Sequence, residues 1–342
     1  MKRKQAMQKE PAGKTGTRPI LSLLLRWEAI LLAMFVAVIV VNSFLTPYFL
    51  DASNLLDNTF NFTEKAIIAL PLTLGIILGD IDISVAGIIA LVSLVMGAGS
   101  AAGAGSAFLV ATGLATGLAC GLLNGLLATR FGIPNIAVTI GSMSLYRGIA
   151  YAVLGDKAFT KYPKSFAFFG QGYIPGTPVP FELILFAALA ALFGLLLHRT
   201  TFGRKVYAIG NNAVATRFSG VAVNRIRLTV SCLIGLMSAV AGILLTSRIA
   251  STRPNIASGW ELEVVTTVVL GGVAITGGRG NLGGVIIGIF LLGYLKFGMG
   301  LLNVPGNVMN IASGLLLFLA ILLPGWVQRI QERGRLSRTR AL

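Results

Sequence analysis

Apolar segments separated by short polar turns occupy most of the chain between residues 29 and 325. Most of them approach the roughly 20 residues with which an α-helix crosses the hydrocarbon layer of a membrane. The pattern predicts an all-α polytopic membrane protein with about ten transmembrane helices. We expect these helices at residues 29–45, 64–78, 85–105, 108–129, 135–154, 181–197, 228–247, 264–275, 282–299 and 310–323.

Two of these segments, 64–78 and 264–275, are too short to cross the membrane as single straight helices. Pro71 interrupts the first of them, and each runs into a Gly-rich polar turn. Broken or re-entrant helices are tolerated at membrane depth only where protein buries them or where they line a cavity. Such breaks are typical of a translocation pathway.

Composition supports the membrane assignment. The chain of 342 residues is 55% hydrophobic and only 12% charged, which excludes a soluble domain of this length. Its 42 glycines favour close helix packing through small residues. The net charge of +16 does not indicate nucleic acid as a partner, because the basic residues lie in short turns and tails beside apolar segments.

The positions of the charges predict an orientation. Most of the 28 Lys and Arg residues fall in the two ends of the chain and in turns on one side of the predicted bundle, whereas most of the 12 acidic residues fall on the other side. By the positive-inside rule both termini are cytoplasmic. We therefore expect a basic cytoplasmic tail over residues 1–28, a transmembrane domain over 29–325 and a second basic tail over 326–342.

One loop, residues 198–227, is polar and basic and contains no acidic residue. Its apolar residues have helical spacing, which predicts two short helices with a break at residues 210–212. A folded cationic loop on the cytoplasmic side indicates a contact surface for a cytoplasmic partner. The alternative is a solvated connector whose charges only fix the topology.

No motif for catalysis or nucleotide binding is present in the sequence. It lacks a P-loop, an HExxH motif and a nucleophile elbow, and its only histidine is His198. Cys120 and Cys232 lie in apolar segments, as small core residues do. We therefore predict no catalytic residue, no metal site and no cofactor bound by this chain, so that active transport would take its energy from an ion gradient or another subunit.

Two acidic residues, Asp80 and Asp82, flank the break after residue 78. They are consistent with a cation site or a gate, since ionisable groups inside a membrane are costly and usually functional. Alternatively, Asp82 or Ser84 caps the next helix and Asp80 closes the turn.

Other polar residues of the predicted spans are further candidates. Arg147 is compatible with three roles: lining the pathway, extending to the outer surface, or pairing with Glu64. Lys296 is expected to extend to the membrane surface. The candidate pathway or gate residues are Asp80, Asp82, Ser84, Asn124, Thr139 and Arg147.

Several segments, in order along the chain, resemble the permease subunits of monosaccharide ABC importers, within the branched-chain amino acid permease superfamily. Residues 79–85 (GDIDISV) resemble the GGIDLSV signature of that family. Further similar segments are 123–126 (LNGL), 133–143 (IPNIAVTIGSM), 203–212 (GRKVYAIGNN) and 269–280. The resemblance extends over about residues 30–325.

This resemblance implies a multi-pass permease of the bacterial inner membrane that works by alternating access. The implied partners are cytoplasmic ATPase subunits that hydrolyse ATP, a second permease subunit and a periplasmic sugar-binding protein, besides membrane lipid; nucleic acid is not among them. The ATPase would contact residues 203–223 of the 198–227 coupling loop. The coupling residues would be Gly203, Arg204, Lys205, Gly210, Asn211, Ser219 and Gly220.

The sequence departs from the family pattern at Asp80, where glycine is usual. Together with residues 61–65 (NFTEK), this acidic residue makes the chain most similar to rhamnose-type permeases. Two other classes of protein remain open on the residues alone. One is an ion-coupled secondary transporter or facilitator of a small polar solute, and the other is a membrane enzyme built around Asp80 and Asp82.

Overall fold

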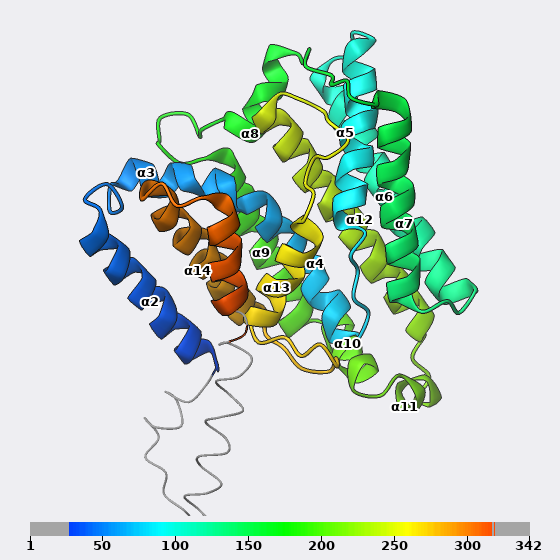
Figure 1. The fold of residues 1–342 in the computed structure, drawn as a ribbon. Helices are drawn as coiled ribbons and strands as arrows, with labels where there is room; N and C mark the ends of the chain where they lie inside the picture. The colour runs from blue at the N-terminus through cyan, green and yellow to red at the C-terminus, as the bar shows by residue number, and fades with distance from the viewer. Residues whose placement is uncertain (1–26, 317, 319–342) are drawn as a thin grey trace, which may run out of the picture.

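The structure is a computed structural model that describes residues 27–316 and 318, and this part of the chain is almost entirely helical. Successive helices run in alternate directions between two ends of a bundle (Figure 1). Six helices are long and apolar enough to cross a membrane, or seven if one bent pair counts as a single span. The predicted class, an all-α polytopic membrane protein, is confirmed.

The six long helices are α2 (Trp27–Leu45), α6 (Ser106–Arg130), α7 (Asn135–Leu154), α9 (Phe181–Arg199), α12 (Val223–Ile249) and α14 (Leu282–Leu301). Shorter elements complete the fold: α3 (Ala52–Asn58), η1 (Thr59–Asn61), α4 (Thr63–Ile77), α5 (Val85–Ala101), η2 (Lys164–Ala167), α8 (Phe168–Gln171), α10 (Thr201–Asn211), α11 (Ala213–Phe218) and α13 (Trp260–Leu270).

The predicted spans 85–105 and 264–275 correspond to α5 and α13, which are shorter than the six long helices. The tenth predicted span, 310–323, begins earlier, in a helix over residues 306–316, and its end lies outside the described residues. Both predicted tails also lie almost wholly outside them. The start of α2 and the end of helix 306–316 are found at the same end of the bundle as α10 and α11 (Figure 1). We call this end the α10 end, and the opposite one the α8 end.

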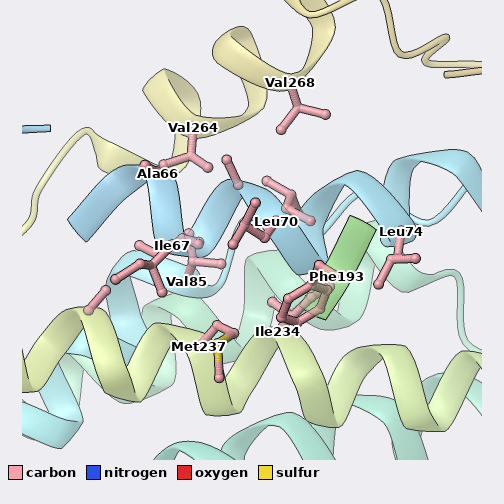
Figure 2. Packing of buried hydrophobic residues seen from close by; sticks show 14 of the residues in the cluster. Ala66, Ile67, Leu70, Leu74, Val85, Phe193, Ile234, Met237, Val264 and Val268 are labelled. Atoms are coloured by element: carbon pink, nitrogen blue, oxygen red, sulfur yellow. The ribbon is translucent and has the colours of Figure 1, made fainter. Parts of the chain in front are cut away.

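The core surrounds α4, which is buried along nearly its whole length. Ile67 and Leu70 of α4 lie between α13, represented by Val264, and α12, represented by Ile234 and Met237 (Figure 2). A helix that is apolar on all sides belongs inside the protein. The first of the two short predicted segments is therefore the central helix of the bundle.

Pro71 does not interrupt α4, contrary to the prediction. The helix continues through it from Thr63 to Ile77, although proline removes one backbone donor. The bend lies instead at Phe62, where the axis turns by 55° between residues 52–61 and 63–77. The break in this segment is thus at its start, at the α8 end.

The abundant glycines pack helices closely, as predicted. The most extensive helix contact is between α6 and α12, and it is lined by Gly117, Gly121 and Gly235. A β-carbon on Gly235 would collide with the carbonyl oxygen of Gly117 and the backbone of Gly121. The two helices therefore approach to a separation that only glycine permits at these positions.

Candidate functional site

The basic loop folds into the two short helices that its apolar spacing predicts. The Thr200 side chain caps the start of α10 by accepting a hydrogen bond from Gly203 N. Asn212 separates the helices and caps α11 through Ala215 N, at 2.9 Å. The loop is shorter than predicted, because α12 already begins at Val223.

The last turn of α10 packs on the end of α4 and on the turn between α13 and α14. The backbone N–H of Gly278, in the turn after α13, donates to the carbonyl of Ile77 at 2.8 Å. Gly210 lies against both groups, and a β-carbon there would collide with the Ile77 carbonyl and approach Gly278 N. Only glycine fits at this position.

Two side chains of α10 add hydrogen bonds at the same place. The Tyr207 hydroxyl donates to the Gly280 carbonyl at 2.7 Å, and Asn211 Nδ2 donates to the Gly278 carbonyl at 3.3 Å. We call the contact among residues 207–211, 77–79 and 277–280 the junction. The junction therefore joins α10 to the end of α4 and to the turn between α13 and α14.

The seven predicted coupling residues fall into two groups. Gly203 and Gly210 are packed against the rest of the chain, and Asn211 contributes its side chain to the junction. The other four are exposed to solvent: Arg204, Lys205, Ser219 and Gly220.

Sequence reasoning missed an apolar feature of the same loop. Val214 and Phe218 are four residues apart on α11 and expose 67% and 89% of their surface. Residues at this spacing share one face of a helix. An exposed apolar face among basic residues is a feature of contact surfaces between proteins.

Three of the predicted pathway residues meet in a buried polar chain. Asp82 Oδ1 accepts hydrogen bonds from Ser84 N and Ser84 Oγ, at 2.8 and 2.6 Å, just before α5 begins. Asn124 Nδ2 of α6 donates to Ser84 Oγ at 2.9 Å, and Asn124 Oδ1 accepts from the Tyr146 hydroxyl of α7. Ser84 is the N-cap residue of α5, but neither its side chain nor that of Asp82 accepts a hydrogen bond from the first turn of the helix. The arrangement instead ties the start of α5 to α6 and α7.

Thr139 and Arg147 take no part in this network of buried hydrogen bonds. The Thr139 hydroxyl bonds within its own helix, to the Ile136 carbonyl. The Arg147 guanidinium donates to the Ser258 hydroxyl at 2.7 Å and to two backbone carbonyls of the segment between α12 and α13. The alternative in which Arg147 pairs with Glu64 is wrong, because Glu64 pairs with Arg248 at 2.7 Å.

Asp80 faces a different part of the protein from Asp82. Its carboxylate lies 3.1 Å from the Nε atom of Arg227, near the start of α12. The pKa of the Asp80 carboxyl is raised, mainly by burial. The positive charge of Arg227 opposes this shift, and the negative charge of Asp82 adds to it. Asp80 therefore links the turn between α4 and α5 to the C-terminal side of the basic loop.

A second ionic cluster, at the α8 end, was not predicted. Glu263 of α13 pairs with Lys65 of α4 at 2.9 Å and with Lys296 of α14 at 2.5 Å. Lys296, which was expected to extend to the membrane surface, forms an ion pair with Glu263. These residues are distant in the sequence, and no local pattern brings them together.

The family model described as "Branched-chain amino acid transport system / permease component" matches residues 54–321. The chain is 36% identical to the ribose import permease protein RbsC of Bacillus subtilis over 294 residues, which cover 85% of this chain and 90% of that protein.

Two further relatives have comparable similarity. The autoinducer 2 import system permease protein LsrD of Klebsiella pneumoniae is 36% identical over 308 residues, which cover 88% of this chain and 92% of LsrD. RbsC of Escherichia coli (strain K12) is 33% identical over 297 residues, which cover 86% of this chain and 92% of that protein. No solved structure matches the chain.

Proposed function

This chain belongs to the family of branched-chain amino acid transport system permease components, and we propose that it imports ribose or autoinducer 2 as the membrane subunit of an ATP-driven importer. It is a multi-pass membrane protein and a transport subunit rather than an enzyme. The expected rhamnose specificity finds no support, because the relatives reported above are named for ribose and autoinducer 2.

The junction is the observation that carries this proposal. A subunit driven by a separate ATPase needs a contact that passes movement from its cytoplasmic surface to the membrane helices. Gly210 places the end of α10 directly on Ile77 and Gly278, where α4 and the turn after α13 meet. An ion-coupled transporter acting alone has no need of such a connection.

The remaining subunits of the importer belong to the proposal. Cytoplasmic ATPase subunits dock on the exposed face of α10 and α11, with Phe218 as the apolar contact and Arg204 and Lys205 as the charged ones. A second permease subunit and a periplasmic sugar-binding protein complete the complex in the bacterial inner membrane. ATP is bound and hydrolysed by the ATPase subunits.

Docking is tested with two variants of the tagged full chain, co-expressed with its ATPase. Phe218→Ser removes an exposed aromatic group, and Arg204→Glu/Lys205→Glu reverses two exposed charges. Both are expected to lower the amount of ATPase that copurifies by at least about tenfold, which corresponds to about 1.4 kcal/mol. Lys157→Glu, exposed on a loop at the α8 end, is the matched control. Unchanged copurification in both variants would show that the ATPase docks elsewhere.

Transport is tested in cells without their own ribose and autoinducer 2 carriers that express this chain with its ATPase and binding protein. We expect saturable uptake of labelled ribose or autoinducer 2 that needs a hydrolytically active ATPase. A protonophore should leave uptake unchanged while cellular ATP is maintained. Uptake that persists without the ATPase and stops with the protonophore would overturn the proposal in favour of the ion-coupled transporter.

A further inference from the structure

A hollow of about 740 Å³ opens at the α10 end, between the turn after α4, the turn after α6 and the start of α12. Three arginines line it: Arg130, Arg217 and Arg227. Asp80 is the only acidic residue among the described residues that line it. The hollow is therefore a positively charged concavity, in which two guanidinium charges have no matching carboxylate among residues 27–316.

The three arginines differ in the hydrogen bonds and ion pairs that their guanidinium groups form. Arg227 is paired with Asp80, yet its buried Nε makes no hydrogen bond of good geometry within the described part of the chain. Arg217 makes one long hydrogen bond, 3.4 Å, from Nη2 to Asn224 Oδ1. Arg130 forms no ion pair with any described residue. Donors of Arg130 and Arg217 therefore remain unengaged by the described residues, and Arg227 can exchange Asp80 for another anion.

Like charges around one concavity repel each other, and a bound dianion would compensate both excess charges. The planar guanidinium group suits phosphate, because it can donate two parallel hydrogen bonds to phosphate oxygens. Asn135 and Ser231 line the same hollow and add amide and hydroxyl groups that can bond a hydroxylated body. We propose that this hollow binds a phosphate monoester, whose dianionic phosphate is held by Arg130, Arg217 and Arg227.

Binding at this site competes with Asp80 for Arg227. The ligand therefore acts on the contact between the α4–α5 turn and the start of α12, beside the junction. Two sources supply a phosphate monoester at a cytoplasmic surface: a soluble sugar phosphate and the headgroup of phosphatidic acid. The proposed function is needed only for the statement that the sugar phosphate derives from the imported sugar. The binding site itself does not depend on the proposed function.

The test uses the full chain alone, purified into phosphatidylcholine nanodiscs at low ionic strength. Isothermal titration calorimetry measures the binding of ribose 5-phosphate, inorganic phosphate and ribose. A second preparation with phosphatidic acid in the nanodisc is compared by its temperature of unfolding. Arg130→Gln/Arg217→Gln is the site variant. Arg225→Gln is the matched control, because Arg225 is an exposed arginine of α12 that does not line the hollow.

We expect ribose 5-phosphate to bind saturably, ribose not to bind, and the site variant to weaken binding by at least about tenfold while the control binds as the original chain does. Stabilisation by phosphatidic acid alone, lost in the site variant, would assign the site to the lipid headgroup. If neither ligand acts, or if the site variant and the control behave alike, the proposal is wrong. Because no transport is measured, this outcome is independent of the uptake experiment.

Discussion

The carboxylate of Asp80 lies 3.1 Å from the Arg227 guanidinium and joins two segments that are far apart in the sequence. Asp80 stands in the turn between α4 and α5, and Arg227 stands in the second turn of α12. Both side chains are only partly exposed, at 18% and 35%. Asp80 is therefore a structural partner of the C-terminal side of the basic loop.

A double-mutant cycle measures this ion pair. Asp80→Asn and Arg227→Gln each remove one charge, and in phosphate-free buffer we expect a coupling energy of about 1 kcal/mol between them. The readout is the free energy of unfolding of the purified chain in detergent. Effects that simply add would show that the two charges do not interact in the folded protein.

The glycine packing between α6 and α12 is tested by comparing two glycine-to-alanine variants. Gly235→Ala places a methyl group against the Gly117 carbonyl and should destabilise the protein by about 2 kcal/mol. Gly148→Ala, in α7, is the control, because no atom lies within 4 Å of the added carbon. It should leave stability unchanged or raise it by up to about 1 kcal/mol through helix propensity. The comparison is made by the temperature of unfolding in detergent, and equal effects of the two variants would contradict the observed packing.

In the buried ion pair between Glu64 and Arg248, replacing the arginine should destabilise the protein more than replacing the glutamate. Glu64 is fully buried and one of its oxygens accepts from Arg248, whereas Arg248 also bonds to Asn61 Oδ1 at 3.2 Å. Arg248→Met leaves a buried carboxylate without its cation and should cost about 3 kcal/mol. Glu64→Gln keeps an acceptor for Arg248 and should cost about 1 kcal/mol. The free energy of unfolding of each variant is measured. A larger loss for Glu64→Gln than for Arg248→Met would show that Arg248 does not stabilise the Glu64 carboxylate.

Much of the fold follows from local sequence, because each membrane helix is an apolar segment bounded by polar or Gly-rich turns. Residues 135–154 form one helix with the predicted bounds. The start of α12 was placed five residues late, since Arg225 and Arg227 looked like loop residues. Val223 and Val230 of the same segment are buried, and this packing extends the helix through the basic residues.

The site was only partly predictable, for a physical reason. The two short helices of the loop follow from apolar spacing, whereas the hydrogen bonds of Asp82 to Ser84 lie before α5 and do not cap its free N–H groups. The junction depends on backbone contacts among three segments, which leave no periodic signal. The ion pairs of Glu64 and Glu263 likewise join residues that are distant along the chain, so the sequence offered no basis for choosing Arg248 as the partner of Glu64.

We propose that the junction passes movement of α10 to α4 and to the turn between α13 and α14. The variant Tyr207→Phe/Asn211→Ala removes the side-chain hydrogen bonds to Gly280 and Gly278 while leaving the backbone contact of Gly210 in place. The decisive measurement is the ratio of substrate imported to ATP hydrolysed, with the complete importer in proteoliposomes. We predict that the variant assembles and hydrolyses ATP, but that this ratio falls at least about tenfold. An unchanged ratio would show that these hydrogen bonds do not pass the movement of α10 to the membrane helices.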